Sequence, residues 1–594
     1  MSHYDYGVIV FYFLFMIVIG WIFRTYNRDS SDFFRGGGTM LWWLVGATAF
    51  MTQFSAWTFT GAGSKAYHDG TLILILYWGN AIGYFMNYLW SAARFRQMRV
   101  VTAMEAVRDR FGKNNEQFFT WMSLPIGVFY AGIWLNAISK FVSVVFGLDL
   151  ILTILFVGIV VLFMATFGGS WAVVASDFMQ VLILMPMSLV AAFLAVRAVG
   201  GGAFFDGAAQ FMQKLPENHL DWTAIIRPQI VYLWIFATLL KQFCTTNSIG
   251  LSYRYLCAKD SANARKAGLL ASVLFLVGPV IWFIPPMAAA ILYPDLSAVP
   301  ELAPLGNKVS DGAFVLIGLR TMPMGMLGLM VSGIFAATMS SMDSGLNKNA
   351  GIFVRNFYRP VLRQKAGEQE LLIVGKITTA LFGVLVILAA LYVENIKEFG
   401  LFDVMQLFSS FINIPYAIPL ILAMIIKRSP RWSAWSTILL GFCISAFVNY
   451  ILDPEIVQRL IGLESEFTAR EARDYLFFTS LILNVFLCSA WFIGTSFLFG
   501  RKNTKEVKKQ QDEFFERMNT PVVVSADQSL EKDRSQLSVL GKLCLCYGGF
   551  IFLLVLIPNT VTGRLCFVFT GLSMAVIGLL LYRKSLTLKQ IKRM

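Results

Sequence analysis

Histidine, cysteine and charged residues are all scarce in this sequence. Its 594 residues include three histidines and seven cysteines, and only 14% of them are charged. The cysteines lie in or at the ends of apolar segments, where a disulfide framework is not expected. The histidines lie far apart, and no nucleophile–base pair or transition-metal cluster stands out. We therefore expect a protein that is not an enzyme and that binds no organic cofactor.

Long apolar runs dominate the chain instead. Hydrophobic residues make up 57% of it, and the mean hydropathy is +0.65. A run of about eighteen apolar residues can cross a bilayer as a helix. We count about fifteen such runs, which predict an all-α polytopic protein embedded in the lipid bilayer. The runs centre near residues 6–24, 39–67, 71–93, 118–146, 151–169, 171–198, 229–252, 266–293, 322–354, 371–393, 400–426, 433–453, 474–499, 538–557 and 564–582.

The net charge of +14 follows this predicted topology and indicates no nucleic-acid partner. Basic residues cluster in the loops after runs one, three, seven, nine, eleven, thirteen and fifteen, whereas the intervening loops hold few. Cytoplasmic loops are the ones enriched in Lys and Arg. We therefore expect a multi-pass plasma (inner) membrane protein with its N-terminus outside and its C-terminus in the cytoplasm.

Changes in composition divide the chain into five parts. We predict, in order, an N-terminal helix and loop, a ten-helix core, two accessory helices, a charged cytoplasmic linker, and two C-terminal helices with a basic tail, over residues 1–36, 37–430, 431–500, 501–536 and 537–594. The linker reads as a solvated charge run. The longest outside loop, 199–228, contains a predicted short amphipathic segment. The sequence carries no indication of an oligomeric state.

The segment from Ile334 to Asn347 is the most informative part of the chain. It lies inside an apolar run, yet it is rich in hydroxyl groups and carries the carboxylate of Asp343. An ionisable group at membrane depth is a functional-site hypothesis. Hard oxygen ligands suit a small hard cation. At helical spacing, one face of the segment carries Ala337, Ser340, Ser341 and Ser344.

Two further runs read as interrupted helices. The stretches 46–63 and 240–250 are polar and contain glycine near mid-membrane. They belong to the second and seventh runs, so they cross the membrane in opposite directions. Paired broken helices in two inverted halves are typical of a secondary transporter site at the bilayer midplane. The two stretches also share a motif, since at equal spacing they contain Gln53-Phe54-Ser55 before Gly61 and Gln242-Phe243-Cys244 before Gly250.

Several motifs, in order along the chain, resemble those of one family. They are Asp32-Phe-Phe-Arg-Gly-Gly-Gly38, Val101-Thr-Ala-Met-Glu-Ala-Val-Arg-Asp-Arg-Phe-Gly112, Phe167-Gly-Gly-Ser-Trp-Ala-Val-Val-Ala-Ser-Asp177-Phe-Met-Gln180, Arg254-Tyr-Leu-Cys-Ala-Lys259 and the segment from Ala337 to Asn347. Together they resemble the sodium:solute symporters, which include sodium–glucose, sodium–proline, iodide and sialic acid carriers. The resemblance covers residues 5–430, and the last four runs match only in hydropathy.

The resemblance implies both a fold and an activity. The fold is a LeuT-like five-plus-five inverted repeat, formed by runs two to eleven, with one extra N-terminal helix and about four extra C-terminal helices. The activity is sodium-coupled symport, in which a small polar organic solute such as a sugar, a sugar acid or another carboxylate is imported by alternating access. The partners are then the solute and sodium ions. A proton-coupled transporter of the same fold and a transporter-like membrane sensor are the alternatives.

The resemblance also implies a sodium site between the second and ninth runs. Its ligands are the backbone carbonyls of Met51, Phe54 and Ala337 and the hydroxyls of Ser340 and Ser341. An unwound helix frees carbonyls that can replace the water shell of sodium, so the residues themselves favour the same interpretation. The alternative is that the serines only allow close packing of helices, as small residues do.

A second cation site involves Asp177, Asp343 and Ser344, because some family members bind a second sodium at these positions. Asp343 stands where the family usually has a serine. Two nearby carboxylates can strengthen a cation site or share a proton. The alternative for Asp177 is a structural residue that caps the turn at Gly168-Gly169.

The substrate positions implied by the resemblance differ from those of the sugar carriers. A phenylalanine, Phe275, replaces the lysine that those carriers use. Lys241 lies at a depth where an ammonium group needs an anion, so we hypothesise that it pairs with a substrate carboxylate. The alternative is a lysine that snorkels or pairs with an aspartate. The substrate-binding candidates are Thr58, Tyr77, Asn80, Lys241 and Gln406.

Overall fold

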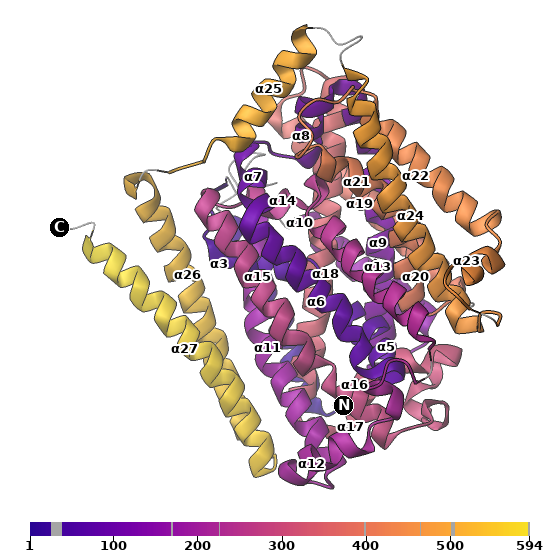
Figure 1. Ribbon diagram of the computed structural model, residues 1–594. Helices are drawn as coiled ribbons and strands as arrows, with labels where there is room; N and C mark the ends of the chain where they lie inside the picture. The colour runs from indigo at the N-terminus through magenta and orange to yellow at the C-terminus, as the bar shows by residue number, and fades with distance from the viewer. Residues whose placement is uncertain are drawn as a thin grey trace.

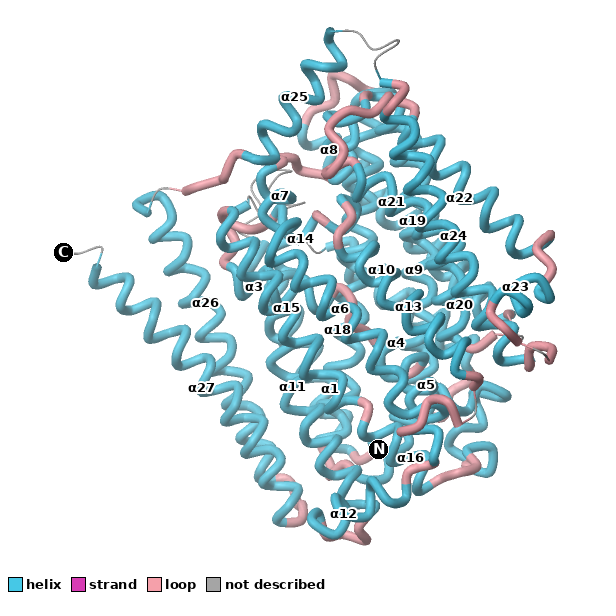
Figure 2. Tube along the Cα trace, in the orientation of Figure 1, coloured by secondary structure: helices cyan, strands magenta, loops and turns pink. Residues whose placement is uncertain are grey.

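The computed structural model describes residues 1–24, 38–167, 170–224, 226–396, 399–463, 465–499, 505–524 and 526–591. Over these ranges the chain is almost wholly helical, with one isolated bridge between Met40 and Ala258 as its only β pairing (Figure 2). Within the same ranges, eleven helices are long and apolar enough to cross a membrane. The predicted all-α membrane architecture is confirmed, and the total of about fifteen spans stays a prediction.

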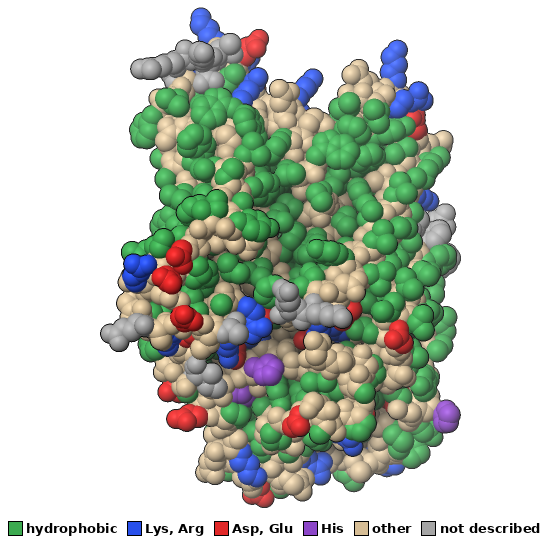
Figure 3. All heavy atoms as spheres, turned by 90° about the vertical axis from the view of Figure 1, so that its right-hand side faces the viewer, with side chains coloured by type: hydrophobic (Ala, Val, Ile, Leu, Met, Phe, Trp, Pro, Cys, Tyr) green, Lys and Arg blue, Asp and Glu red, His purple; other side chains and the backbone are tan. Residues whose placement is uncertain are grey.

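The helices lie side by side between two ends of an elongated bundle (Figure 1). One end holds α25 (Lys505–Asn519) and α8 (Ala103–Phe111), and the other holds α12 (Phe204–Lys214) and α16 (Ile284–Leu292). We name these the α25 end and the α12 end. The N-terminus lies toward the α12 end and the C-terminus toward the α25 end. On the face shown in Figure 3, Lys and Arg side chains rim the α25 end above a broad hydrophobic surface.

The first broken helix consists of α3 (Trp42–Met51), α4 (Ala56–Phe59) and α5 (Gly61–Asp69). Between α3 and α4 the backbone becomes extended at Ser55, whose side chain caps α4 by accepting a hydrogen bond from the amide of Trp57. The amide of Ala56 donates to the Thr338 hydroxyl at 2.7 Å. Non-helical backbone at membrane depth needs such partners, and here polar side chains supply them.

The second broken helix consists of α13 (Pro228–Thr246), η5 (Ile249–Leu251) and α14 (Tyr253–Leu256). Both predicted interruptions are therefore present. The shared motif, however, does not mark equivalent positions. Gln53 lies in the first break, whereas Gln242 lies inside α13 and the chain leaves the helix only after Thr246. The breaks are set by local hydrogen-bond partners, which the motif does not encode.

Helix α18 (Met326–Ile352) runs through the centre of the bundle, and its apolar stretch is wholly buried. It packs against α1 (His3–Arg24), α9 (Lys113–Phe146) and α11 (Ser170–Val199). The Asp5 carboxylate accepts hydrogen bonds from the amides of Gly325 and Gly328 at 2.8 and 2.9 Å. An acceptor at a helix N-terminus satisfies free amides and favours the helix dipole, so α1 fixes the position of α18.

The remaining core helices surround these three elements. They are η2 (Gly70–Ile73), α6 (Leu74–Met86), η3 (Asn87–Ser91), α7 (Ala92–Gln97), α10 (Leu150–Phe167), α15 (Ser261–Trp282), η7 (Pro300–Gly312), α17 (Ala313–Thr321), α19 (Glu368–Asn395), α20 (Leu401–Phe408), η9 (Ser409–Asn413) and α21 (Ile414–Leu422). Helices α22 (Ser433–Tyr450) and α24 (Ala469–Ser496) pack on the side of α21. Helices α26 (Ala526–Leu553) and α27 (Val561–Ile591) form a hairpin beside α11 (Figure 1). The amphipathic segment predicted in loop 199–228 is α12.

The segment 501–536, predicted as a charged cytoplasmic linker or surface helix, carries a helix whose charged residues are mostly exposed and whose other face is buried. Its described part contains α25 and the start of α26, and Phe514 and Met518 of α25 are buried. Asp512 accepts hydrogen bonds from Arg428 at 2.9 Å, and Arg517 donates to Asp109 at 2.6 Å. Two of the charged residues, Asp512 and Arg517, therefore pair with loops of the core, because one face of α25 is apolar and packs against the bundle.

Candidate functional site

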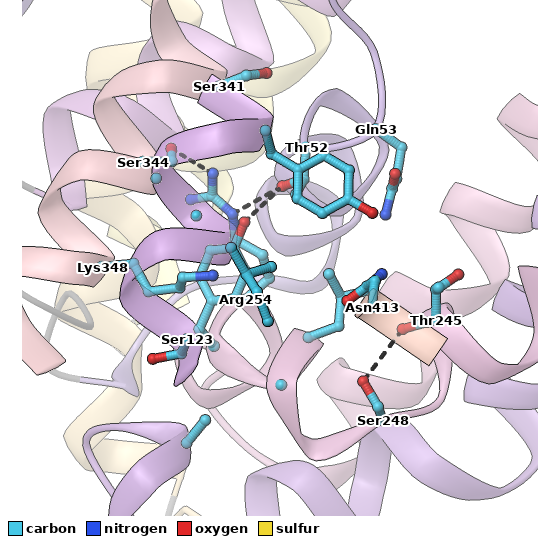
Figure 4. A pocket seen from close by; sticks show the side chains of 18 of the residues that line it. Thr52, Gln53, Ser123, Thr245, Ser248, Arg254, Ser341, Ser344, Lys348 and Asn413 are labelled. Carbon is cyan, nitrogen blue, oxygen red and sulfur yellow. Dashed lines mark hydrogen bonds between the residues drawn. The ribbon is translucent and has the colours of Figure 1, made fainter. Parts of the chain in front are cut away.

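A pocket of about 250 Å³ lies between the two broken helices and α18. It is lined at mid-bundle by Trp57 and Tyr77, and it extends to Thr102 and Ala103 at the start of α8. It therefore leads from the centre of the bundle toward the α25 end. Figure 4 shows polar side chains from both breaks and from α18 directed into it.

The pocket is closed toward the α12 end by aromatic rings and charges. The Trp57 ring stacks on Phe402 with 5.8 Å between centroids, and its indole nitrogen donates to the Leu401 carbonyl at 3.4 Å. Next to these rings, Asp69 forms ion pairs with Lys65 at 2.7 Å and with Arg470 at 2.5 Å. The pocket is thus closed on this side and extends toward the α25 end.

Three of the five predicted sodium ligands meet at the first break. The Ser341 hydroxyl of α18 donates to the Met51 carbonyl at 3.0 Å and to the Phe54 carbonyl at 3.4 Å. Ala337 lies one turn earlier on the same buried face of α18. Two backbone carbonyls and a hydroxyl from a facing helix thus form a cluster of hard oxygens, which suits a small hard cation.

Ser340 has a different partner. Its hydroxyl donates to Asp177 of α11, and the Thr48 hydroxyl of α3 donates to the same carboxylate. The two neighbouring serines thus contact different oxygen clusters. The predicted capping of the turn at Gly168-Gly169 by Asp177 falls on glycines outside the described residues.

Arg254 lies among the residues predicted to form a second cation site. Its guanidinium lies 3.7 Å from the Asp177 carboxylate. It also donates to Ser344 at 2.5 Å and to Thr52 at 3.0 Å (Figure 4). Asp343 is buried, and one of its carboxylate oxygens has no hydrogen-bond partner among the described residues. The structure thus joins Asp177 and Ser344 through an arginine and leaves Asp343 beside that group.

The predicted substrate residues are only partly brought together. Tyr77, Asn80 and Lys241 line the pocket, whereas Thr58 and Gln406 lie behind its wall. The Lys241 ammonium donates to the side-chain carbonyl of Gln406. The Asn80 side chain accepts from Gln242 at 2.7 Å. Phe275 is core, because its ring stacks on Tyr84 with 5.4 Å between centroids.

Three of the substrate candidates carry buried polar atoms without hydrogen-bond partners among the described residues. They are the side-chain nitrogen of Gln406, which lies beside Lys241, and the hydroxyls of Thr58 and Tyr77. Buried polar groups in native proteins are normally satisfied, so this part of the cavity suits a polar ligand.

Three residues of the site were not predicted from the sequence in these roles. Thr48 lies one turn before Thr52, and its position on the buried face of α3 was the only available signal. The joining of Asp177 to Ser344 by Arg254 requires contacts between distant segments. Lys348 lies seven residues after Ser341, close to two helical turns, and this spacing places it on the pocket side of α18.

Known proteins match this chain in sequence over most of its length. The model of the "Sodium:solute symporter family" matches residues 33–441. Sodium/myo-inositol cotransporter 2 of Bos taurus is 28% identical over 536 residues, which cover 82% of this chain and 76% of that protein. The sodium/sialic acid symporter SiaT of Proteus mirabilis is 26% identical over 440 residues, which cover 72% of this chain and 86% of that protein.

Two solved structures share the fold. A sodium-coupled sialic acid symporter in a substrate-bound outward-open state superposes with a TM-score of 0.64 and 21% identity, over 84% of this chain and 98% of that one. Mhp1, a nucleobase-cation-symport-1 family transporter, superposes with a TM-score of 0.50 and 14% identity, over 82% and 99%. The predicted LeuT-like inverted-repeat fold is confirmed by these neighbours.

Proposed function

Because the chain belongs to the sodium:solute symporter family, we propose that it couples the entry of sodium to the import of a small polar organic anion. Of the solute classes considered from the sequence, a sugar acid or another carboxylate fits best. The observation that carries this choice is the charge of the pocket. Its lining includes Lys241, Arg254 and Lys348 but no described aspartate or glutamate.

Lys241 is the proposed anchor for the carboxylate. It is 6% exposed, and its one hydrogen-bond partner among the described residues is the neutral Gln406. An ammonium group has three donors, so two are left for a ligand. Burial of an unpaired charge is costly, and a carboxylate from the solute removes that cost. The alternative pairing of Lys241 with an aspartate finds no support in the described residues.

The break after Met51 is the proposed sodium site. Its support is the meeting of the Met51 and Phe54 carbonyls with the Ser341 hydroxyl. The backbone carbonyl of Ala337 and the hydroxyl of Ser340 are the other two proposed ligands, and the Ser340 hydroxyl must turn away from Asp177 to take part. Sodium bound there joins the first broken helix to α18. A ligand that prefers one arrangement of these helices shifts the protein toward it.

The proposed second cation site contains a competing positive charge. The Arg254 guanidinium contacts both Asp177 and Ser344, and it supplies the charge that a second sodium ion at Asp177 and Ser344 also supplies. We therefore favour one coupled sodium in this conformation, with Asp177 and Arg254 acting as a buried pair. Proton coupling through Asp177 and Asp343 is the runner-up.

The α25 end is proposed to face the cytoplasm of the plasma membrane. The Lys- and Arg-rich loops lie there, and such loops remain cytoplasmic. The pocket is then open to the cytoplasm and closed to the outside. This corresponds to a state in which the solute leaves, and sodium favours the opposite state.

Uptake into proteoliposomes tests the proposed function. Purified protein is given an inward sodium or an inward proton gradient, with sugars, sugar acids, amino acids and monocarboxylates as solutes. We expect sodium-driven uptake of a carboxylate, and at least a tenfold higher KM in Lys241→Met. Uptake of a neutral sugar alone, or an unchanged KM in the variant, contradicts the anionic substrate. Uptake driven only by protons contradicts sodium coupling.

A further inference from the structure

We propose that Lys348 and Asn347 form a second anion-binding site, which receives the carboxylate of the solute after it leaves Lys241. This inference rests on the proposed function and extends it from one anion site to two. Lys348 lies on α18, on the α25 side of the sodium site. Seven residues separate it from Ser341, which is roughly 10 Å along a helix. Its side chain points into the pocket on the side of Arg254 (Figure 4).

The Lys348 ammonium lacks an anionic partner. Within the described residues it forms no ion pair and no hydrogen bond, and its one close contact of this kind is the Tyr253 ring, 5.4 Å from the ring centroid. A contact with an aromatic face attracts a cation but accepts none of the hydrogen bonds of an ammonium group as a carboxylate does. The lysine is thus held in place while its three donors stay free.

Nearby charges make this part of the pocket positive. The Arg254 guanidinium lies over the same Tyr253 ring, 4.8 Å from its centroid. The charge of Arg254 faces Asp177 at 3.7 Å. Asp343 is the other buried carboxylate of this region, and it neither lines the pocket nor pairs with Lys348. Lys348 therefore contributes a positive charge that the described residues do not neutralise.

Asn347 adds a second donor without an acceptor. Its side-chain nitrogen is buried and has no hydrogen-bond partner among the described residues, and the residue lines the same pocket. A buried amide donor without an acceptor is unfavourable, so a ligand that supplies one is stabilised. Both donors lack acceptors, lie on consecutive residues of α18 and line the same pocket, so they are available to the oxygens of a carboxylate. A neutral sugar can accept hydrogen bonds from the same donors but gains no attraction between opposite charges.

Along the bundle axis, the two lysines lie on opposite sides of the helix breaks. Lys241 lies on α13 before its break, toward the α12 end, and Lys348 lies toward the α25 end. A carboxylate released by Lys241 therefore passes a second cation before it reaches the cytoplasm. Without that cation, the anion crosses a low-dielectric part of the route uncompensated, where an isolated charge is strongly disfavoured.

Transport measured separately from each side tests the second site. Proteoliposomes are loaded with the best transported of D-glucuronate, N-acetylneuraminate and lactate, with D-glucose as the neutral probe. We expect Lys348→Met to raise the half-saturating concentration at the cytoplasmic side at least fivefold. The value at the outer side is expected to change less than twofold, and Lys348→Arg is expected to restore both values. Lys376→Met changes an exposed lysine of α19 and serves as the matched control.

The outcomes separate the two proposals. If the wild type transports none of the three anions, the proposed function fails. If it transports an anion and Lys348→Met behaves as the wild type does, the second site alone is overturned. An equal change at both sides, or an equal change for D-glucose, assigns Lys348 a structural role and also overturns the site. Thermal midpoints in detergent establish that each variant is folded.

Discussion

The two helix breaks line the same pocket, but different kinds of contact hold them in place. At the first break, the Met51 and Phe54 carbonyls share one hydroxyl from another helix, that of Ser341. At the second, Asn247 donates to the Gly83 carbonyl of α6 at 3.2 Å and accepts from the Ser91 hydroxyl at 2.7 Å.

This difference indicates two roles for similar interruptions. A single hydroxyl can rotate away from two carbonyls, so the first break can exchange its contact for a cation. The second break is closed by amide side chains, since the Asn87 amide also donates to the Thr246 carbonyl at 3.1 Å. We expect the first break to bind sodium and the second to hold α13 against α6.

Removal of the Asn247 side chain gives the largest expected loss of stability. Asn247→Ala leaves polar groups of Asn87, Ser91 and Gly83 with fewer partners inside the bundle. Each buried group left unsatisfied costs about 1–3 kcal/mol. We expect a clearly lower Tm in detergent and an unchanged sodium dependence of the remaining transport. Asn114→Ala, an exposed change in α9, is the control. A changed sodium dependence contradicts the different roles assigned to the two interruptions.

Removal of the Ser341 hydroxyl has the opposite pattern. Ser341→Ala deletes one proposed ligand, and a loss of about 1.4 kcal/mol corresponds to a tenfold weaker affinity. We expect the sodium concentration at half-maximal uptake to rise about tenfold, with Tm in sodium-free buffer changed little. Ser332→Ala removes another buried hydroxyl of α18, one that bonds only to its own helix at 2.7 Å. Equal kinetics in both variants contradict the assignment.

The pH dependence of the α12 end is the smallest expected effect. Burial lowers the pKa of His219 below 6.5. Its Nε2 lies 3.0 Å from the Tyr67 carbonyl of α5, while Nδ1 is buried with no partner among the described residues. A depressed pKa means that the neutral ring contributes its full stability above pH 6.5, and this is lost as the pH falls through the folded-state value. His219 thus holds α5 of the first broken helix.

Tm measured between pH 7.5 and 5 by about half-unit steps tests this contact. We expect the wild type to lose roughly 1 °C more than His219→Gln, which cannot bind a proton and keeps a donor near Tyr67. A parallel decline in both proteins contradicts the role of His219. A decline that requires sodium places the effect at the first break instead.

The sequence alone predicted the parts of the site that depend on composition and helical spacing. Apolar runs indicated the membrane helices, and glycine and polar residues at mid-membrane indicated both breaks. The position of Ser341 opposite Met51 and Phe54 followed from the family resemblance. Each of these features is local, or is shared by many chains of one fold.

Features that depend on the direction of individual side chains were not predictable. Helical spacing places Ser340 and Ser341 on about the same face of α18. In the structure, however, Ser340 contacts Asp177 and Ser341 contacts the first break. Most charges of α25 are exposed as on a solvated helix, and only the facing loops show that Asp512 and Arg517 form ion pairs. The sequence does not distinguish Lys348 from other lysines near helix ends. Its position in the pocket beside Tyr253 is known only from the structure.

Sodium titration of the purified protein tests the central claim most directly. Tm is followed as sodium replaces choline at constant ionic strength, because a ligand that binds the folded state raises Tm with its concentration. The proposed site predicts the same half-saturating sodium concentration in the wild type and in Asn247→Ala, and a value about tenfold higher in Ser341→Ala. A Ser341→Ala titration that coincides with that of the wild type contradicts it.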